Sequence, residues 1–523
     1  MERSKQVRKQ ISDLKDLETF LQETADGAAR ALQNKDIIEA GEKELRRYEV
    51  FTTWILQFLI DCLHPGACFP RRNTALEVIG TVVRILNLQQ GLDDCAVKCN
   101  WKTFFSQLNI RTLIGCLHDS YDVNRCLAND ILSMLPRDVY TFTRVEMLRM
   151  FNQVLSLAQS PQPDNTNTAP CLLKFLTNRN VSGVVTEALL SAFPECTRSL
   201  KNDKCLYALH LIVMKVLISK VEEQLKLAEV NLLDAALNSP LHGTMHCIRE
   251  TLSTVRLTET QDRPSWILIV DKLINCCFRI ANIVGPVVSS SAPEGHIVED
   301  AADHNVMASK IVNELGDASS DQLNNVEKQA YLSQMLLACS WRSMKETMLL
   351  LGDIAASAPV FEMNTQSKVA TSELVPGVTS YFSRINITDV TGFISSSTII
   401  AIGNMFIHIL LSSRHIGAFE LAYPGFVKVC TVLWRSEIAS LQVLPNKWID
   451  ELLASLQSGD ASQSFCVTRR SAGIPFYISV SVRRLSLLDL SALLLFNKGL
   501  DKKFVNKYNI NASIRHFEKI NSF

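Results

Sequence analysis

Residues 340–355 read SWRSMKETMLLLGDIA. The apolar side chains of this stretch follow one another at intervals of three and four residues: Trp341, Met344, Met348, Leu351 and Ala355. Such spacing places them on one face of an α-helix, where they form a stripe that packs against the rest of the protein. The same helical period recurs along most of the chain, and no segment alternates apolar and polar residues over the length of a sheet strand. The sequence therefore predicts an all-α protein.

We expect helices at these approximate positions: 5–34, 41–62, 71–88, 101–117, 122–135, 140–158, 183–193, 203–226, 240–256, 264–284, 327–357, 395–413, 416–439, 446–457 and 466–493. Proline turns separate several of them, because proline lacks a backbone donor and restrains the residue before it. These turns are His64-Pro65-Gly66, Leu135-Pro136, Phe193-Pro194 and Gly285-Pro286. Two longer stretches of polar and small residues, at 160–170 and at about 288–325, are expected to be exposed linkers.

The helices follow one another in pairs of roughly 40 residues, as in helical-repeat proteins whose units bury their apolar faces only against their neighbours. We therefore expect an armadillo- or HEAT-like α-solenoid. There is no strict repeat period, so a large irregular helical bundle remains an alternative with the same local pattern. The expected domains are an N-terminal helical-repeat region at 1–287, a polar linker at 288–326, a second helical region at 327–480 and a divergent tail at 481–523.

The composition is that of a folded protein without a general affinity for nucleic acid. The 523 residues include 53 Lys and Arg and 53 Asp and Glu, so the chain lacks the basic excess of most dedicated nucleic-acid binders. Its first residues are charged and have no apolar secretory core. The most apolar stretches, 207–218 and 398–411, are too short to cross a membrane. We expect a cytoplasmic protein with no transmembrane segment, whose 15 cysteines are reduced.

The motifs of common catalytic and cofactor sites are missing from the sequence. There is no GxxxxGK[ST], no GxGxxG between a strand and a helix, and no GxSxG. Cys62, His64 and Cys68 lie close together in the chain, but paired CxxC spacing is missing, as it is around Cys95 and Cys99. The pair His242 and His246 lacks the Glu of HExxH. We predict no catalytic residues, no metal and no cofactor.

The charged residues of 340–355 form the first candidate binding surface. Arg342, Lys345 and Glu346 lie on a different face from the apolar stripe, and Arg342 and Glu346 have the i, i+4 spacing of an ion pair. One interpretation is a charged surface that meets a partner. The alternative is a solvated face whose ion pairs contribute little free energy.

Residues 468–476, TRRSAGIPF, form the second candidate surface. Arg469 and Arg470 are followed by Ser471 and Gly473, so two charged guanidinium groups lie beside a break where a phosphate or another chain can approach the backbone closely. The alternative is a kinked helix junction with surface arginines.

Taken together, SWRSMKETMLLLGDIA, RHIGAFELAYPGF at 414–426 and TRRSAGIPF resemble the hallmark sequence of the thyroid adenoma-associated protein family, which includes the fungal tRNA-methylation adaptor. Weaker similarities are FPRRNTALEVIGTVVRIL at 69–86 and SYDVNRCLANDIL at 120–132. The resemblance covers about 48–477. It implies an armadillo-type superhelix that is the non-catalytic partner of a tRNA ribose 2'-O-methyltransferase acting at position 32 of the anticodon loop. The implied partners are this methyltransferase and tRNA.

The resemblance has one departure, because family members are far longer and the later part of the tail at 481–523 does not match them. We therefore expect a fragment or an altered gene model. The second hypothesis is a general protein-interaction solenoid, including one that acts on membrane proteins, with no role in RNA modification. An intrinsic enzyme is the least favoured hypothesis, because the alternating strands and helices of a methyl-donor domain are not visible in the sequence.

Overall fold

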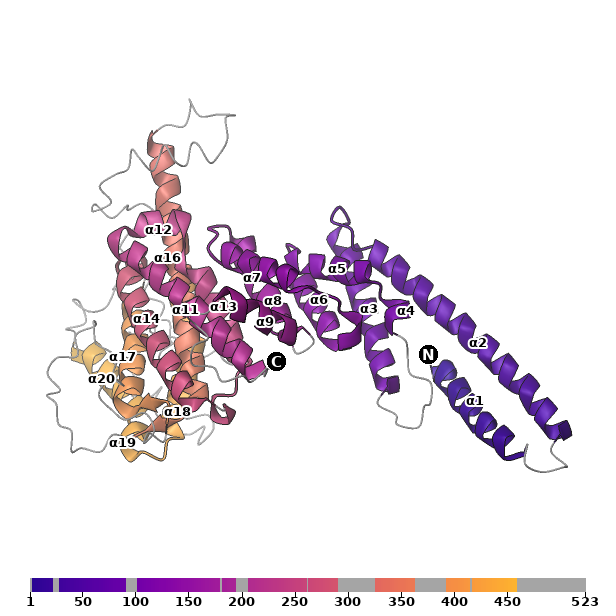
Figure 1. Ribbon diagram of the computed structural model, residues 1–523. Coiled ribbons are helices and arrows are strands. Elements are labelled where there is room, and N and C mark those ends of the chain that lie inside the picture. Colours follow the sequence, from indigo (N-terminus) through magenta and orange to yellow (C-terminus); the bar gives the residue numbers. More distant parts are fainter. Residues whose placement is uncertain are drawn as a thin grey trace. The chain divides into compact units, whose positions relative to one another are not determined.

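The computed structural model describes residues 2–21, 28–90, 101–178, 181–193, 206–260, 262–289, 325–362, 392–413 and 416–458 (Figure 1). These residues are almost entirely helical, which confirms the predicted all-α solenoid class. The chain divides into two compact units. Unit 1 contains the described residues within 1–154 and 167–209, and unit 2 contains those within 155–166 and from 210 onward.

The first part of the chain forms short and long helices in succession. Their bounds are α1 Glu2–Leu21, α2 Ala28–Asp61, α3 Phe69–Gln90, α4 Trp101–Phe104, α5 Gln107–Gly115, η1 Cys116–His118, α6 Asp122–Met134, η2 Arg137–Val139, α7 Arg144–Ala158, α8 Pro163–Leu176 and α9 Ser182–Ala192. In unit 1, α1 lies along α2, and α6 packs against α3 and α5 (Figure 1). Residues with no exposed surface, among them Leu76, Ile79, Ile110 and Leu113, form its core.

Ion pairs join neighbouring helices of unit 1 at the surface. Arg111 of α5 contacts Glu146 of α7 at 2.8 Å, and Arg144 of α7 contacts Glu187 of α9 at 2.7 Å. Exposed pairs of this kind contribute at most about 1 kcal/mol each. They therefore act mainly on the register of adjacent helices, while the buried apolar side chains supply most of the stability.

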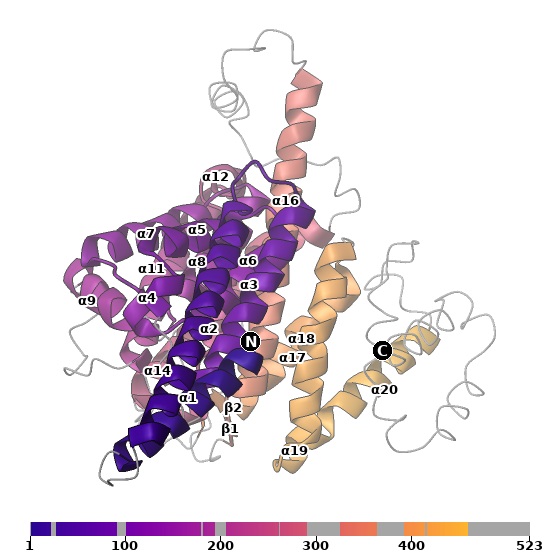
Figure 2. The ribbon, with the colours of Figure 1, turned by 90° about the vertical axis from the view of Figure 1, so that its right-hand side faces the viewer.

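The rest of the chain continues with longer helices. Their bounds are α11 Leu206–Val230, α12 Leu232–Asn238, α13 Leu241–Ser253, η3 Leu257–Glu259, α14 Arg263–Ser289, α16 Asn325–Ser357, α17 Ser396–Ser412, α18 Ile416–Trp434, α19 Ala439–Gln442 and α20 Leu444–Ser458. Helix α16 is central to unit 2, because it packs against α12, α13, α14 and α18. Figure 2 shows α17 and α18 side by side, as their contacts require.

Glycines allow the closest helix crossing in unit 2. A Cβ atom on Gly352 of α16 would lie 2.5 Å from the Cα atom of Gly425 in α18. That distance is shorter than any ordinary contact, so the two backbones meet without intervening side chains. The residues of the predicted stripe that lie nearby, Met344, Met348, Leu351 and Ala355, are all buried, which confirms the stripe except at Trp341, which is only half-buried.

A short parallel strand pair, which sequence analysis did not predict, has one strand directly after α16 and the other directly before α17. Strand β1, Val360–Phe361, pairs with β2, Ile394–Ser395. The Oγ atom of Ser395 then accepts a hydrogen bond from the backbone N–H of Thr398 at 3.1 Å and caps the first turn of α17. Two-residue strands are too short to leave an alternating pattern in the sequence.

The proline turns were predicted with mixed success. Helices end before the turns at Pro65 and Pro136, as expected, and α9 ends at Ala192, while Pro194 itself lies outside the described residues. The linker predicted at 160–170 is wrong, because α8 begins at Pro163. Proline is tolerated at the first position of a helix, since the backbone N–H that it lacks would have no partner within the helix there. The break predicted at Gly285-Pro286 is also wrong. Helix α14 continues to Ser289 because the valines around the proline are buried: Val284, Val287 and Val288.

The expected domain boundaries stay a prediction, and the division into two compact units follows other positions in the chain. Helices α14 and α16, which flank the predicted linker at 288–326, pack together within unit 2, whereas the units divide within α7 to α11. Residues 290–324 of that linker and the tail at 481–523 lie outside the described residues. Within the described part, no helix combines the length and the apolar character that crossing a membrane requires.

Candidate functional site

The predicted charged surface of α16 lies against α13, at the centre of unit 2. Glu346 is almost fully buried there, with 5% of its side chain exposed, while Lys345 keeps 31% of its side chain exposed. Arg249 reaches the carboxylate from α13, and its Nε atom donates a hydrogen bond to Oε2 of Glu346 at 2.9 Å. Lys345 Nζ lies 3.3 Å from the other oxygen, Oε1. Both carboxylate oxygens are therefore paired.

This arrangement corrects the expected pairing of Glu346 with Arg342. Arg249 and Lys345 hold the carboxylate, and the Arg342 guanidinium lies 5.6 Å from the centre of the Trp341 ring, in a cation–π contact. Glu346 is an internal contact between two helices, and its burial removes it from the surface that a partner can reach. Arg342 and Lys345 are partly exposed, and their contact with a partner stays a prediction.

The electrostatics of this cluster keep Glu346 ionised. Burial alone would raise the pKa of Glu346, but His246 in its protonated form, Arg249 and Lys345 together outweigh burial and lower the pKa overall. For Arg249, burial acts to lower the pKa, and the carboxylates of Glu346 and Glu250 outweigh it and raise the pKa. The pair is therefore a charged clamp that fixes α13 against α16.

Two histidines of α13 share the face that carries Arg249. His242 is buried, neither of its ring nitrogens has a hydrogen-bond partner among the described residues, and burial together with the charge of Arg342 lowers its pKa to about 3. Burial also lowers the pKa of His246. Both rings are neutral at pH 7. The spacing of His242, His246 and Arg249, at i, i+4 and i+7, is the sequence signal that could have identified this face.

The second predicted surface lies outside the described residues. The whole stretch TRRSAGIPF follows the last described residue, Ser458. It contains the predicted residues Arg469, Arg470, Ser471 and Gly473. Their role stays a prediction. The first two residues of the block at 414–426 are also outside the described residues, and its remaining part begins α18.

The two N-terminal motifs meet in unit 1, a convergence that sequence analysis did not predict. Arg72, from FPRR, lies 3.1 Å from the buried carboxylate of Asp119, which precedes SYDVNR. Asn124 Nδ2 donates to the same carboxylate at 3.0 Å. The rings of Phe69 and Tyr121 lie 4.3 Å apart. These contacts join the N-terminal end of α3 to the turn before α6.

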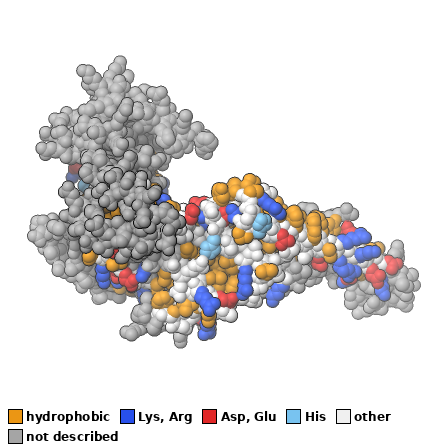
Figure 3. Space-filling view, turned by 90° about the horizontal axis from the view of Figure 1, so that it is seen from above, with side chains coloured by type: hydrophobic (Ala, Val, Ile, Leu, Met, Phe, Trp, Pro, Cys, Tyr) orange, Lys and Arg blue, Asp and Glu red, His pale blue; other side chains and the backbone are white. Residues whose placement is uncertain are grey.

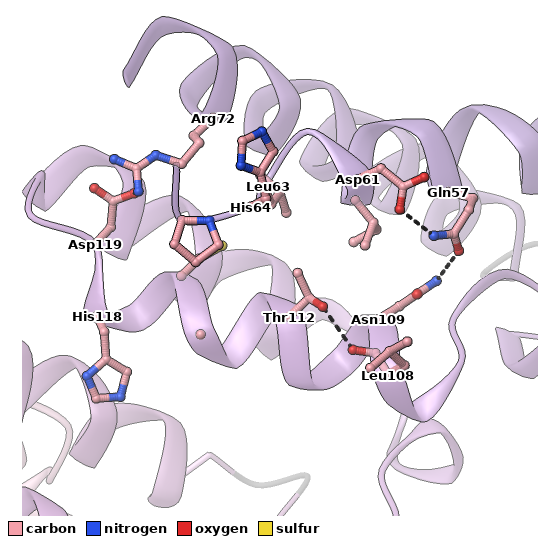
Figure 4. Close-up of a pocket in the computed structure, with 14 residues that line it drawn as sticks. Gln57, Asp61, Leu63, His64, Arg72, Leu108, Asn109, Thr112, His118 and Asp119 are labelled. Atoms are coloured by element: carbon pink, nitrogen blue, oxygen red, sulfur yellow. Dashed lines mark hydrogen bonds and ion pairs between the residues drawn. The ribbon is translucent and has the colours of Figure 1, made fainter. Parts of the chain in front are cut away.

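A pocket of about 630 Å³ opens beside this network (Figure 4). Its walls come from the end of α2, the turn to α3, helix α5 and η1. On one side Asn109 Nδ2 donates to Gln57 Oε1 at 3.3 Å, and Gln57 Nε2 donates to Asp61 at 2.8 Å. On the other side lie Arg72 and Asp119. The volume is within the range of ligand pockets, and the pocket combines an apolar floor with a few polar groups.

Cysteine chemistry in the described residues is that of buried thiols. Burial raises the pKa of Cys276 and of Cys339 to about 11, which keeps them protonated and unreactive at neutral pH. In the described part of the chain, no three His, Cys, Asp or Glu side chains are grouped so that they could hold a metal ion. Cys95 and Cys99 lie outside it.

These features define a class of protein. In the described residues, helices pack against helices that lie near them in the chain, inter-helix ion pairs join them, and the charged groups of the central cluster hold helix to helix. Helical-repeat scaffolds that present surfaces to other macromolecules are built in this way.

Comparison with protein families gives the family. The model described as THADA/TRM732, DUF2428 matches residues 268–484, which include α16 and TRRSAGIPF. The model described as Trm732, TPR repeats matches residues 1–126, which include the pocket. The chain belongs to the thyroid adenoma-associated protein family, as its hallmark blocks predict.

Named relatives agree with this result. The chain is 30% identical over 470 residues to "tRNA (32-2'-O)-methyltransferase regulator THADA" of Canis lupus familiaris, covering 83% of this chain and 23% of the relative. It is 29% identical over 516 residues to the protein of the same name in Homo sapiens, covering 90% and 25%. The regulator trm732 of Schizosaccharomyces pombe is 26% identical over 269 residues, covering 51% and 14%. The chain thus spans about a quarter of the length of the first two relatives.

Proposed function

We propose that this chain acts as a non-catalytic adaptor that supports 2'-O-ribose methylation at position 32 of the tRNA anticodon loop by a partner methyltransferase. The observation that carries the proposal is the printed name of the relatives, each a regulator of tRNA (32-2'-O)-methyltransferase. The helical scaffold supports an adaptor role, because it offers rigid surfaces on which two macromolecules can be held together. In this proposal the methyl donor site and the catalytic residues belong to the partner, which acts in the cytoplasm.

Mapping of ribose methylation tests the proposal directly. Depletion of the protein from its own cells should lower methylation at position 32, and an unchanged level would refute the proposal. Purified protein mixed with S-adenosylmethionine and tRNA should give no product until the methyltransferase is added. Turnover without the methyltransferase would assign the chemistry to this chain instead.

We further propose that tRNA or an acidic partner surface contacts Arg469 and Arg470, beside Ser471 and Gly473. Replacing both arginines with Ala should abolish methylation without lowering the melting temperature, because charge-assisted bonds are lost and no core cavity opens. If the contact is to phosphate, the salt dependence of tRNA binding should also become shallower by about one unit of slope per lost contact. The control is the pair Arg256→Ala and Lys272→Ala, two exposed cations of unit 2.

The second candidate function is a protein-interaction scaffold with no role in RNA modification, including one that acts on membrane proteins. The neutral net charge favours it, since it provides no general attraction to RNA. Affinity purification separates the two functions. The adaptor must recover a methyltransferase and tRNA, and recovery of neither would favour the scaffold.

A further inference from the structure

An exposed aromatic stripe runs along α2 in unit 1. Phe51, Trp54 and Phe58 expose 58%, 59% and 51% of their surfaces, and they are spaced by three and four residues, so they share one face of the helix. The ring centres lie 6.0 Å apart from Phe51 to Trp54 and again from Trp54 to Phe58. Single exposed apolar residues are common, but three aromatic rings in contact form a continuous patch of the kind found at interaction sites.

The stripe leads into the pocket of Figure 4. Gln57 and Asp61, which line the pocket, each follow an aromatic residue of the stripe by three positions, so the stripe and the pocket wall share one helix face. Leu108, which is exposed on α5, contributes apolar surface to the pocket from the opposite side. Stripe and pocket therefore form one surface, which we call the α2 surface: Phe51, Trp54, Phe58, Asp61, Leu108 and the pocket lining.

The charge of the pocket indicates what this surface accepts. The guanidinium of Arg72 is held by Asp119, so neither group offers a free charge to a ligand. The accessible charge is the carboxylate of Asp61, which is exposed and accepts a hydrogen bond from Gln57. A carboxylate at the end of an aromatic stripe attracts a cationic side chain and repels phosphate. An aromatic stripe that ends at a carboxylate suits a protein partner better than RNA. Figure 3 draws one face of the molecule, where side chains of both charges lie among hydrophobic ones.

We infer that the α2 surface docks an amphipathic helix of the partner methyltransferase. The apolar side of that helix covers Phe51, Trp54 and Phe58, and an Arg or Lys side chain enters the pocket and pairs with Asp61. Helix-in-groove recognition uses anchors spaced in this way, and an arginine in a partly enclosed pocket is a common centre of binding energy. This inference rests on the proposed function, which supplies the partner.

The stripe is tested by measuring binding of the purified chain to the purified methyltransferase by calorimetry. The double variant Trp54→Ala and Phe58→Ala should bind at least about 10-fold more weakly, because two aromatic anchors are lost. Both side chains are exposed, so the variant should keep the wild-type melting temperature. Tyr331→Ala, which removes a comparably exposed ring from unit 2, is the control and should bind as the wild type does.

The pocket is tested by filling it. Gly115 lines the pocket, its backbone has ordinary helical angles, and a Cβ atom there would meet nothing within 4 Å. Gly115→Phe should therefore fold normally and weaken binding about 10-fold by occupying the space that the basic side chain needs. Gly183→Phe, at an equally open glycine of α9, is the matched control. Asp61→Asn should weaken binding at low salt and reduce its salt dependence.

The outcomes separate the inference from the proposed function. If wild-type chain does not bind the methyltransferase, the proposed function fails and the inference fails with it. If wild-type chain binds and the stripe and pocket variants bind equally well, only the inference is overturned. Loss of tRNA binding with retained methyltransferase binding would assign the α2 surface to RNA. If light scattering shows a dimer of the wild-type chain and a monomer of the stripe variant, the α2 surface is a self-association surface. Either of these two results overturns the inference.

Discussion

Replacing His242 with Leu should stabilise the protein at neutral pH. His242 is buried in α13, and neither of its ring nitrogens has a hydrogen-bond partner among the described residues. An unpaired buried polar group costs about 1 to 3 kcal/mol, and leucine has a similar volume without polar atoms. We therefore expect His242→Leu to raise the free energy of unfolding by about 1 to 2 kcal/mol at pH 7.5.

The same variant should change how stability depends on pH. The folded pKa of His242 is about 3, below the usual value of 6.5. Because the folded pKa is depressed, the unfolded state binds a proton below pH 6.5 that the folded state does not, so stability falls as the pH falls from 6.5 toward 3. At pH 5, about 1.5 units below the unfolded pKa, this loss is about 2 kcal/mol. The leucine variant has no titratable group at this position, so it does not show this loss of stability.

Urea denaturation of both proteins at several pH values measures this effect. The difference in unfolding free energy between His242→Leu and wild type should grow by about 2 kcal/mol from pH 7.5 to pH 5. His246 and Glu346 titrate in both proteins, so the part of their contributions that does not depend on the charge of His242 cancels in the difference. Met245→Leu, a buried change on the same helix without a titratable group, should show a constant difference. A constant difference for His242→Leu as well would refute the reasoning.

Three further predictions concern α16 and the glycines. Glu346→Gln should lower the free energy of unfolding by about 2 to 4 kcal/mol, because Arg249 in α13 loses its buried counter-charge. Lys345 is partly exposed, so Lys345→Gln should lower the free energy of unfolding by less than about 1 kcal/mol in the same urea titration. Gly352→Ala should cost about 2 kcal/mol or more, because its Cβ would meet the backbone of α18. Gly183→Ala in α9, where a Cβ would meet nothing within 4 Å, should gain up to about 1 kcal/mol, and equal melting temperatures would contradict the crossing. Trp341→Ala should cost about 1 to 3 kcal/mol in thermal melts, since the ring is half-buried, and a loss above about 4 kcal/mol would mean that it is a core residue.

The sequence by itself determined the helical class, most helix positions and the family. Helical spacing depends only on the order of apolar residues along the chain, so the stripe of α16 could be predicted from residues 340–355 alone. The turns at Pro65 and Pro136 were also predictable, because proline acts on its own backbone. The hallmark blocks identified the family because each of them is a contiguous stretch of sequence that can be compared without knowledge of the fold.

Only the tertiary structure decided which of these residues meet. Pro170 and Pro286 lie within helices because packing around them outweighs the local preference for a break. Glu346 has a suitable partner in Arg342 one turn away, yet it pairs with Arg249, which is 97 residues distant. A buried carboxylate has lost its contact with water, so it is stabilised by a cation that is buried beside it. Which cation lies close enough is a property of helix packing, and local spacing in the sequence does not contain it.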